Sequence, residues 1–292
     1  MKKLFLLLLP VLLLCGCSQK PAADIAATTL PVYDFTTALT QGTPLTVTRL
    51  VTEEVSCLHN YSLNVRQVQA AEAADVIVQS GAGLEEFLHD LLQDKAVIDA
   101  SEGIELLCPE EEHEDDHDHH SHSGHSHEED PHIWLSPGNA AVMAENICAG
   151  LCRRYPQYQE IFQGNLPGLL EQLASLQAYG EQELSCLSCR EMIPFHDGFS
   201  YFAQSFGLTI VEAVEEESGS EASAKELIHL IALVREHDPP AIFVEKNGSS
   251  SAASILSRET GAEVYTLDMA MSGSSYFDAM YHNIDTVKEA LQ

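Results

Sequence analysis

The stretch DVIVQSGAGLEEFLHDLLQDKAVIDA, residues 75–100, decides the fold class. It begins with the apolar run 76–78, which is typical of a strand buried on both faces of a parallel sheet. Gly81-Ala82-Gly83 ends this strand, and residues 84–92 have the apolar spacing of an amphipathic helix. A second strand is expected over residues 95–100. This order of strand, helix and strand predicts a βαβ unit in a parallel sheet.

The same alternation extends toward both ends of the chain. On the amino-terminal side we expect strands over residues 25–30 and 45–51, a helix over 33–40, and a helix over 64–74 capped by Ser62. On the carboxyl-terminal side we expect strands over 191–195, 208–214, 241–245 and 263–267, alternating with helices over 198–206, 224–236, 251–260 and 275–291.

Two helical patterns separate these halves. One starts at Ser136-Pro137 and ends near Arg154, and the other covers residues 158–184, interrupted only by Pro167-Gly168. The second is longer than most globular helices, so we place it between two lobes. The expected fold is α/β, with two similar Rossmann-like lobes that contain parallel sheets and are joined by a long linker helix.

The amino terminus has the pattern of a targeting segment. Lys2 and Lys3 precede an apolar run over residues 4–14 that is too short to span a bilayer. The run ends in Leu14-Cys15-Gly16-Cys17, which resembles the lipobox of bacterial lipoprotein signal peptides. The resemblance implies cleavage after Gly16 and a lipid on Cys17; an ordinary secretory signal is the alternative. We therefore expect a lipid-anchored protein outside the cytoplasmic membrane.

These patterns give the expected domain boundaries. Residues 1–16 are the signal peptide, 17–157 the amino-terminal lobe, 158–185 the linker helix and 186–292 the carboxyl-terminal lobe. The formal net charge of −31 argues against nucleic acid and anionic membrane surfaces as partners, and for attraction of cations.

A histidine-rich tract lies within the amino-terminal half, over residues 110–130. It has no apolar residue, so we expect an unpacked loop. Imidazole and carboxylate are ligands that suit zinc and similar ions, which predicts low-affinity metal capture; a solvated acidic loop is the alternative. The seven histidines are His113, His117, His119, His120, His122, His125 and His127.

The cysteines do not settle their own pairing. Cys186-Leu-Ser-Cys189 is either a strained disulfide or half of a zinc site, and no second Cys-x-x-Cys completes the latter. Cys148 and Cys152 lie four residues apart on an expected helix, where buried thiols are favoured. Disulfides are permitted in an exported protein, and Cys57 and Cys108 complete the set after Cys17.

Four residues are candidate ligands for one ion: His59, His132, His196 and Asp268. Each follows or flanks an apolar strand, where a parallel sheet presents its carboxyl end and binds ligands. Three imidazoles and one carboxylate suit zinc. Taken singly, a loop histidine is more often a surface residue, and Asp268 is more often a cap.

Four motifs then add a family resemblance. Leu58-His-Asn-Tyr-Ser-Leu, Asp130-Pro-His-Ile-Trp-Leu-Ser-Pro, Pro194-Phe-His-Asp-Gly-Phe-Ser-Tyr-Phe and Thr266-Leu-Asp268 resemble, in order, the ligand motifs of the zinc/manganese substrate-binding proteins of ABC importers. The resemblance implies a bilobed fold with an ion in the inter-lobe cleft, held by His59, His132, His196 and Asp268. In this family a Glu at the third position is associated with manganese, so His196 favours zinc. A His-rich loop before the second motif is typical of its zinc-specific members.

We therefore expect a monomeric, non-enzymatic binding component of a metal importer, which captures Zn²⁺ and delivers it to an ABC permease in the cytoplasmic membrane. The alternatives are a manganese-binding importer component and a zinc-storage or adhesion lipoprotein that uses only the tract. A zinc hydrolase is disfavoured, because catalytic zinc usually has three protein ligands and the chain has no HExxH motif.

Overall fold

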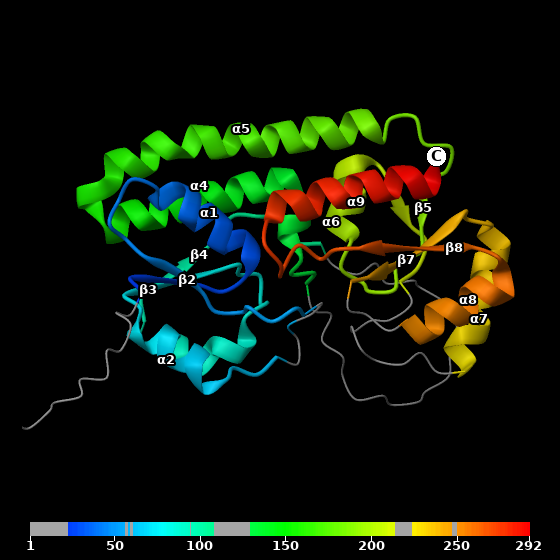
Figure 1. The fold of residues 1–292 in the computed structure, drawn as a ribbon, viewed down its shortest axis with the longest axis horizontal. Coiled ribbons are helices and arrows are strands. Elements are labelled where there is room, and N and C mark those ends of the chain that lie inside the picture. Colours follow the sequence, from blue (N-terminus) through cyan, green and yellow to red (C-terminus); the bar gives the residue numbers. More distant parts are fainter. Residues whose placement is uncertain are drawn as a thin grey trace, which may run out of the picture.

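The computed structural model describes residues 23–55, 58, 61–93, 95–107, 129–213, 224–246 and 250–292. Within these residues the chain forms two α/β lobes that lie side by side beneath one long helix (Figure 1). All paired strands are parallel. The expected fold class is confirmed.

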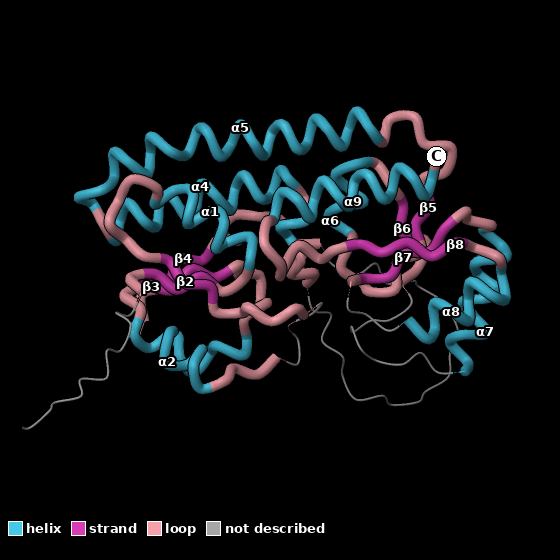
Figure 2. Tube along the Cα trace, in the orientation of Figure 1, coloured by secondary structure: helices cyan, strands magenta, loops and turns pink. Residues whose placement is uncertain are grey.

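The first lobe is built on a four-stranded sheet of order β2-β1-β3-β4. Val76, Ile77 and Val78 of β3 are each no more than 1% exposed, as predicted for a strand covered on both faces. Figure 2 shows helices above and below this sheet. The elements are β1 (Ile25–Ala27), α1 (Leu30–Thr40), β2 (Val47–Arg49), α2 (Val65–Ala73), β3 (Val76–Gln79), η1 (Glu86–Leu88), α3 (His89–Leu92), β4 (Val97–Asp99), η2 (Ile133–Leu135) and α4 (Pro137–Arg154).

The second lobe repeats this plan with two strand pairs, β5-β6 and β7-β8. Backbone hydrogen bonds join the two pairs just after β5. Phe195 N donates to Phe243 O at 2.7 Å, and Phe243 N donates to Ile193 O at 3.0 Å. The elements are β5 (Glu191–Met192), α6 (Ser200–Phe206), β6 (Thr209–Ile210), α7 (Ala224–His237), β7 (Ala241–Glu245), α8 (Ser250–Thr260), β8 (Glu263–Leu267) and α9 (Tyr276–Leu291).

The helix α5 (Gln159–Glu183), which follows η3 (Pro156–Tyr158), spans the upper side of both lobes (Figure 1). It packs on α1 and α4 of the first lobe and on α6 and α9 of the second. It continues through Pro167, where an interruption was expected. A single hydrophobic core runs along these helices through both lobes, with a smaller cluster on the opposite face of each sheet.

The connection between β8 and α9 ties the second lobe to the first. Leu30 N at the start of α1 donates to Met271 O at 3.1 Å. Arg49 at the end of β2 donates from Nη1 to Gly273 O at 2.8 Å. These bonds, which join residues more than two hundred positions apart, hold the loop after β8 against the first lobe.

Local expectations failed at two places in the first lobe. The cap of α2 is Asn64, not Ser62: Asn64 Oδ1 accepts from Gln67 N at 3.1 Å, and Gln67 Oε1 accepts from Asn64 N at 2.8 Å. This reciprocal capping box satisfies two helix-end donors, which Ser62 lies too far upstream to do. The helix expected over residues 84–92 is reduced to η1 and the single turn α3.

The four cysteines among the described residues are free thiols. Cys148 is buried on α4, and burial raises the pKa of its thiol to about 12, as expected for an inert core thiol. Cys57 and Cys108 lie outside the described residues. Among the helices that the structure describes, none has the length and apolar character needed to cross a bilayer.

Candidate metal centre

Two of the four candidate ligands lie together at the junction of the lobes. The Nε2 atoms of His132 and His196 are 3.4 Å apart, and their ring planes are inclined by 87°. Both side chains are 1% exposed. His132 directly precedes η2 in the first lobe, and His196 follows the bridge that joins β5 to β7 in the second. Each lobe therefore contributes one imidazole nitrogen.

The separation of the two nitrogens is the one that a tetrahedral zinc ion requires. Zn–N bonds of about 2.0–2.1 Å at a tetrahedral angle place two ligand nitrogens about 3.3–3.4 Å apart. The observed 3.4 Å between the Nε2 atoms matches this value. The distance between the two nitrogens therefore fits an ion bound to both imidazoles.

Asp130 fixes the orientation of His132, a role that the sequence reasoning did not assign. Its Oδ1 accepts from His132 Nδ1 at 2.8 Å and from His132 N at 2.9 Å. A proton held on Nδ1 leaves the lone pair on Nε2, which is the nitrogen that faces His196. The signal was present in the motif Asp130-Pro-His132, because a carboxylate two residues before a histidine can reach its ring.

Tyr201 of α6 joins the site to the two ends of the histidine-rich tract. Its hydroxyl donates to Asp130 O at 2.9 Å and accepts from Leu107 N at 2.9 Å. Asp130 N in turn donates to Leu107 O at 2.9 Å. The residues that flank 108–128 are thus held side by side, directly next to His132.

Gly198 allows the close packing around His196. A Cβ at this position would lie 2.7 Å from Met269 Cε and 2.8 Å from His196 Cδ2, closer than any ordinary contact. A larger residue at this position of the motif Pro194-Phe-His-Asp-Gly would therefore push aside the Met269 side chain, the His196 ring or both.

Trp134 links the loops that carry His132 and Asp268. Its Nε1 donates to Met269 O at 2.8 Å, and its own carbonyl accepts from the Tyr276 hydroxyl at 2.8 Å. The side chain is fully buried, and its ring centroid lies 5.4 Å from that of His132. One residue thus connects both candidate ligand loops.

Asp268 lies at the carboxyl end of β8, as expected from the sequence. Asn283 of α9 holds its backbone, accepting from Asp268 N at 2.8 Å and donating to Asp268 O at 2.7 Å. The carboxylate accepts from Ala270 N at 2.9 Å through Oδ1, and its Oδ2 lies 3.4 Å from Lys246 Nζ. Its neighbouring cation here is therefore a lysine ammonium.

His59, the seven histidines of the tract and Cys17 lie outside the described residues. Among the residues that the structure describes, no group of three or more His, Cys, Asp or Glu side chains is close enough to hold a metal ion. The structure thus places two candidate ligands together, His132 and His196, and places Asp268 beside Lys246.

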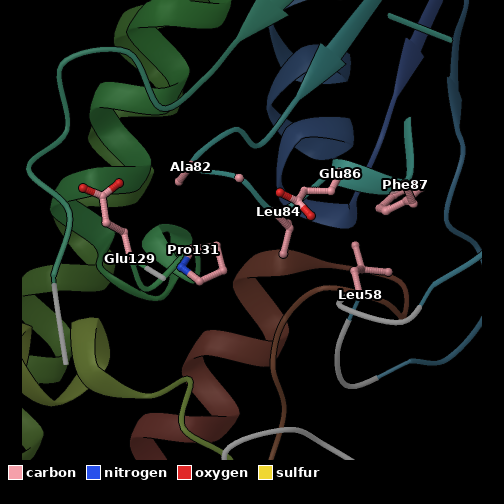
Figure 3. A pocket seen from close by; sticks show the side chains of 8 residues that line it. Leu58, Ala82, Leu84, Glu86, Phe87, Glu129 and Pro131 are labelled. Carbon is pink, nitrogen blue, oxygen red and sulfur yellow. The ribbon is translucent and has the colours of Figure 1, made fainter. Parts of the chain in front are cut away.

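A cavity of about 190 Å³ is lined by residues that directly precede two candidate ligands in the chain. It is lined by Leu58, which precedes His59, and by Glu129 and Pro131, which precede His132. Figure 3 shows Ala82 and Leu84 of the loop after β3 between these two sides. Glu86 also lines the cavity, so its wall contains two carboxylates.

Two parallel-sheet lobes that meet at a buried imidazole pair, beneath a helix that spans both, define a two-lobed solute-binding protein. Residues 25–290 match the family model described as zinc-uptake complex component A, periplasmic. The chain belongs to this family.

Named relatives agree with the family assignment. The chain is 33% identical to the zinc-binding lipoprotein AdcA of Streptococcus pneumoniae, over 99% of this chain and 61% of that protein, so it spans about three fifths of the length of this relative. It is 30% identical to the high-affinity zinc uptake system protein ZnuA of Bacillus subtilis, over 99% of this chain and 97% of that protein.

A solved structure shows the same fold. The crystal structure of the Zn(II)-bound ZnuA-like domain of Streptococcus pneumoniae AdcA superposes with a TM-score of 0.75 at 28% identity. The match covers 92% of this chain and 98% of that one. The two-lobed arrangement is therefore common to this chain and a zinc-bound relative.

Proposed function

We propose that this chain is the extracytoplasmic Zn²⁺-binding component of an ABC-type importer, which captures the ion between its lobes and delivers it to a membrane permease. The observation that carries the proposal is the pair of buried Nε2 atoms, 3.4 Å apart and contributed by different lobes. Zinc is the substrate of this function and undergoes no reaction on the protein.

The four-ligand site is the second part of the proposal. His132 and His196 supply two nitrogens, and His59 and Asp268 complete a tetrahedral set. When the ion binds, the Asp268 carboxylate gives up its ion pair with Lys246 and coordinates the ion instead. Three imidazole nitrogens favour zinc over manganese. Manganese instead prefers sites rich in carboxylate, carbonyl and water oxygens.

The remaining parts of the proposal concern the position of the protein and its accessory segment. A lipid on Cys17 anchors the monomer outside the cytoplasmic membrane, and residues 17–157, 158–185 and 186–292 form the lobe, linker and lobe. The histidines of the tract collect zinc weakly. The residues that flank 108–128 are held together near His132, because Asp130 N donates to Leu107 O at 2.9 Å.

Calorimetric titration of the mature chain with Zn²⁺ and Mn²⁺ tests this function. We compare residues 18–292 with a variant in which 110–128 are replaced by two glycines, a short link that suffices because Asp130 N already bonds Leu107 O. We expect several weak zinc events and one tight event in the parent, only the tight event in the variant, and weak manganese binding in both.

A tract of the same length with every histidine changed to serine is the control, because it keeps the chain length and the carboxylates. It should behave as the shortened variant does. If the tight event disappears with the tract, the chain is a storage or adhesion lipoprotein instead. If manganese binds as tightly as zinc, the manganese importer is the better assignment.

Lys246→Gln tests the proposed role of Asp268. Removal of the ammonium 3.4 Å from Oδ2 leaves the carboxylate without its competing cation and lowers the repulsion of an incoming divalent ion. We expect zinc affinity in the shortened variant to rise by about two- to fivefold, since a half-exposed ion pair is worth up to about 1 kcal/mol, a factor of about five. Lys225→Gln, on an exposed position of α7, is the matched control; equal effects of the two changes would argue against the exchange.

A further inference from the structure

Glu85 is a buried carboxylate that has no part in the proposed metal site. Its side chain is 5% exposed and lies between the end of β3 and η1. Oε1 accepts from Thr28 Oγ1 at 2.6 Å and from Ser80 N at 2.7 Å, and Oε2 accepts from Gly81 N at 3.0 Å. The carboxylate therefore joins the ends of β1 and β3 through three donors. A carboxylate is suited to this position, because both of its oxygens accept.

The turn that Glu85 holds is strained. Gly81, Ala82 and Gly83 have φ values of 84°, 55° and 80°, a left-handed run that is unfavourable for the alanine. A Cβ at Gly81 would lie 2.0 Å from Asp99 Oδ1. Such a turn persists only when surrounding groups hold it, and Glu85 supplies two of its backbone contacts.

This turn also forms a wall of the 190 Å³ cavity whose lining includes Leu58 and Pro131. Ala82, Gly83 and Leu84 face the cavity together with Leu58 and Pro131 (Figure 3). Leu58 and Pro131 each directly precede a candidate ligand, His59 and His132. A change in the turn therefore changes the cavity wall that faces Leu58 and Pro131.

We propose that Glu85 is a positioning residue for zinc binding: it holds the turn 80–84 against the end of β1 and so fixes the cavity wall shared with Leu58 and Pro131, the residues directly before His59 and His132. This inference rests on the proposed zinc function. Glu85 acts through the turn and does not contact the ion.

The ionisation of Glu85 provides an independent readout. Burial raises the pKa of its carboxyl from the ordinary 4.5 to about 7, with a further contribution from the neighbouring Asp99 on β4, although the three donors lower it. Glu86 and His89, from η1 and α3, line a small cavity together with Glu85. Since the folded chain holds this proton more tightly than the unfolded chain, stability due to Glu85 is greatest below pH 4.5 and falls as pH rises to about 7.

The test uses Glu85→Gln, which retains the size of the side chain but replaces one of its two acceptor oxygens with an amide NH₂ donor. Ser80 N or Gly81 N, each of which donates to a different oxygen of Glu85, then loses its acceptor. Thr28→Val removes one donor without a change in charge, and Thr28→Ser restores it. Glu72→Gln, at an exposed position on α2, is the matched charge control. Each is made in the chain that lacks the tract, and we measure zinc affinity, amide exchange at Ser80 and Gly81 in the metal-free protein, and unfolding at pH 5 and pH 8.

We expect Glu85→Gln and Thr28→Val to speed exchange at the turn and to weaken zinc binding, each by about tenfold, the worth of one hydrogen bond to a charged group. Thr28→Ser and Glu72→Gln should match the parent. The loss of stability between pH 5 and pH 8 should be smaller in Glu85→Gln than in the parent. Faster exchange with unchanged zinc affinity would overturn the proposal, as would unchanged exchange.

The outcomes separate this inference from the zinc function on which it rests. If the parent binds zinc tightly and His132→Ala does not, but both variants at the turn bind as the parent does, only the role of Glu85 is wrong. If the parent itself lacks a tight zinc site, the proposed function fails and the inference falls with it, whatever the exchange data show. If Glu85→Gln fails to fold, the Thr28→Val and Thr28→Ser pair decides.

Discussion

His132→Ala is expected to weaken tight zinc binding by more than about 100-fold. Even groups that only orient a metal ligand typically contribute about 10- to 100-fold to affinity, and His132 is proposed as a ligand itself. The change removes one of two buried nitrogens 3.4 Å apart and leaves His196 to face an empty space. Calorimetric titration of the chain that lacks residues 110–128 measures the effect without interference from the tract.

Two further variants serve as an intermediate case and as a control for this experiment. Asp130→Asn keeps the imidazole but weakens the acceptor 2.8 Å from its Nδ1, so we expect an intermediate loss of about 10-fold or more. His229→Ala, on the exposed face of α7 where the ring pairs with Glu212, should bind zinc as the parent does. Parental affinity in His132→Ala would show that this residue is not a ligand.

Trp134→Ala is expected to lower the free energy of unfolding by about 3–5 kcal/mol, the range for removal of a large buried aromatic side chain. The ring is fully buried, and the variant also loses the hydrogen bond from Nε1 to Met269 O. Urea unfolding of the metal-free chain measures the change. Because this bond joins the loops that carry His132 and Asp268, zinc affinity should fall as well.

Trp134→Phe separates packing from the hydrogen bond. It retains most of the buried apolar surface and loses Nε1, so about 1–3 kcal/mol should be lost, the cost of leaving Met269 O without its donor. Val65→Ala, at a side chain that is 72% exposed, should change stability by less than about 0.5 kcal/mol. A loss below about 1 kcal/mol in Trp134→Ala would show that this ring does not hold the lobes together.

Periodicity was enough to predict most elements, because local spacing reports which face of an element is covered. The continuous apolar run 76–78 became the buried strand β3, and β7 and β8 have the predicted bounds. Ser136 and Ser275 cap α4 and α9 through local hydrogen bonds. The expectation of one continuous helix failed at residues 84–92, where the structure has the 3₁₀ turn η1 and the single turn α3. Glu85, at the start of this stretch, accepts from Ser80 N and Gly81 N of the preceding turn, a contact that the spacing does not indicate.

Motif spacing identified the candidate ligands but not their partners. The motif Asp130-Pro-His132 allows a contact between the carboxylate and the ring, but only the folded chain shows that Asp130 Oδ1 accepts from His132 Nδ1. Lys246 could not be paired with Asp268 from the sequence, since their contact depends on the register of β7 against β8.

The sequence by itself determined the α/β alternation, the long helix between the halves and the acidic charge, because these properties depend on composition and local periodicity, and its short motifs supplied the candidate zinc ligands. Only the tertiary structure decided that His132 and His196, which are 64 residues apart, meet at 3.4 Å, and that Trp134, Tyr201 and Glu85 hold the surrounding loops. The contacts of His132, Trp134 and Tyr201 arise from the packing of one lobe on the other, and the contact of Glu85 with Thr28 arises from the packing within the first lobe. No local pattern encodes either kind of packing.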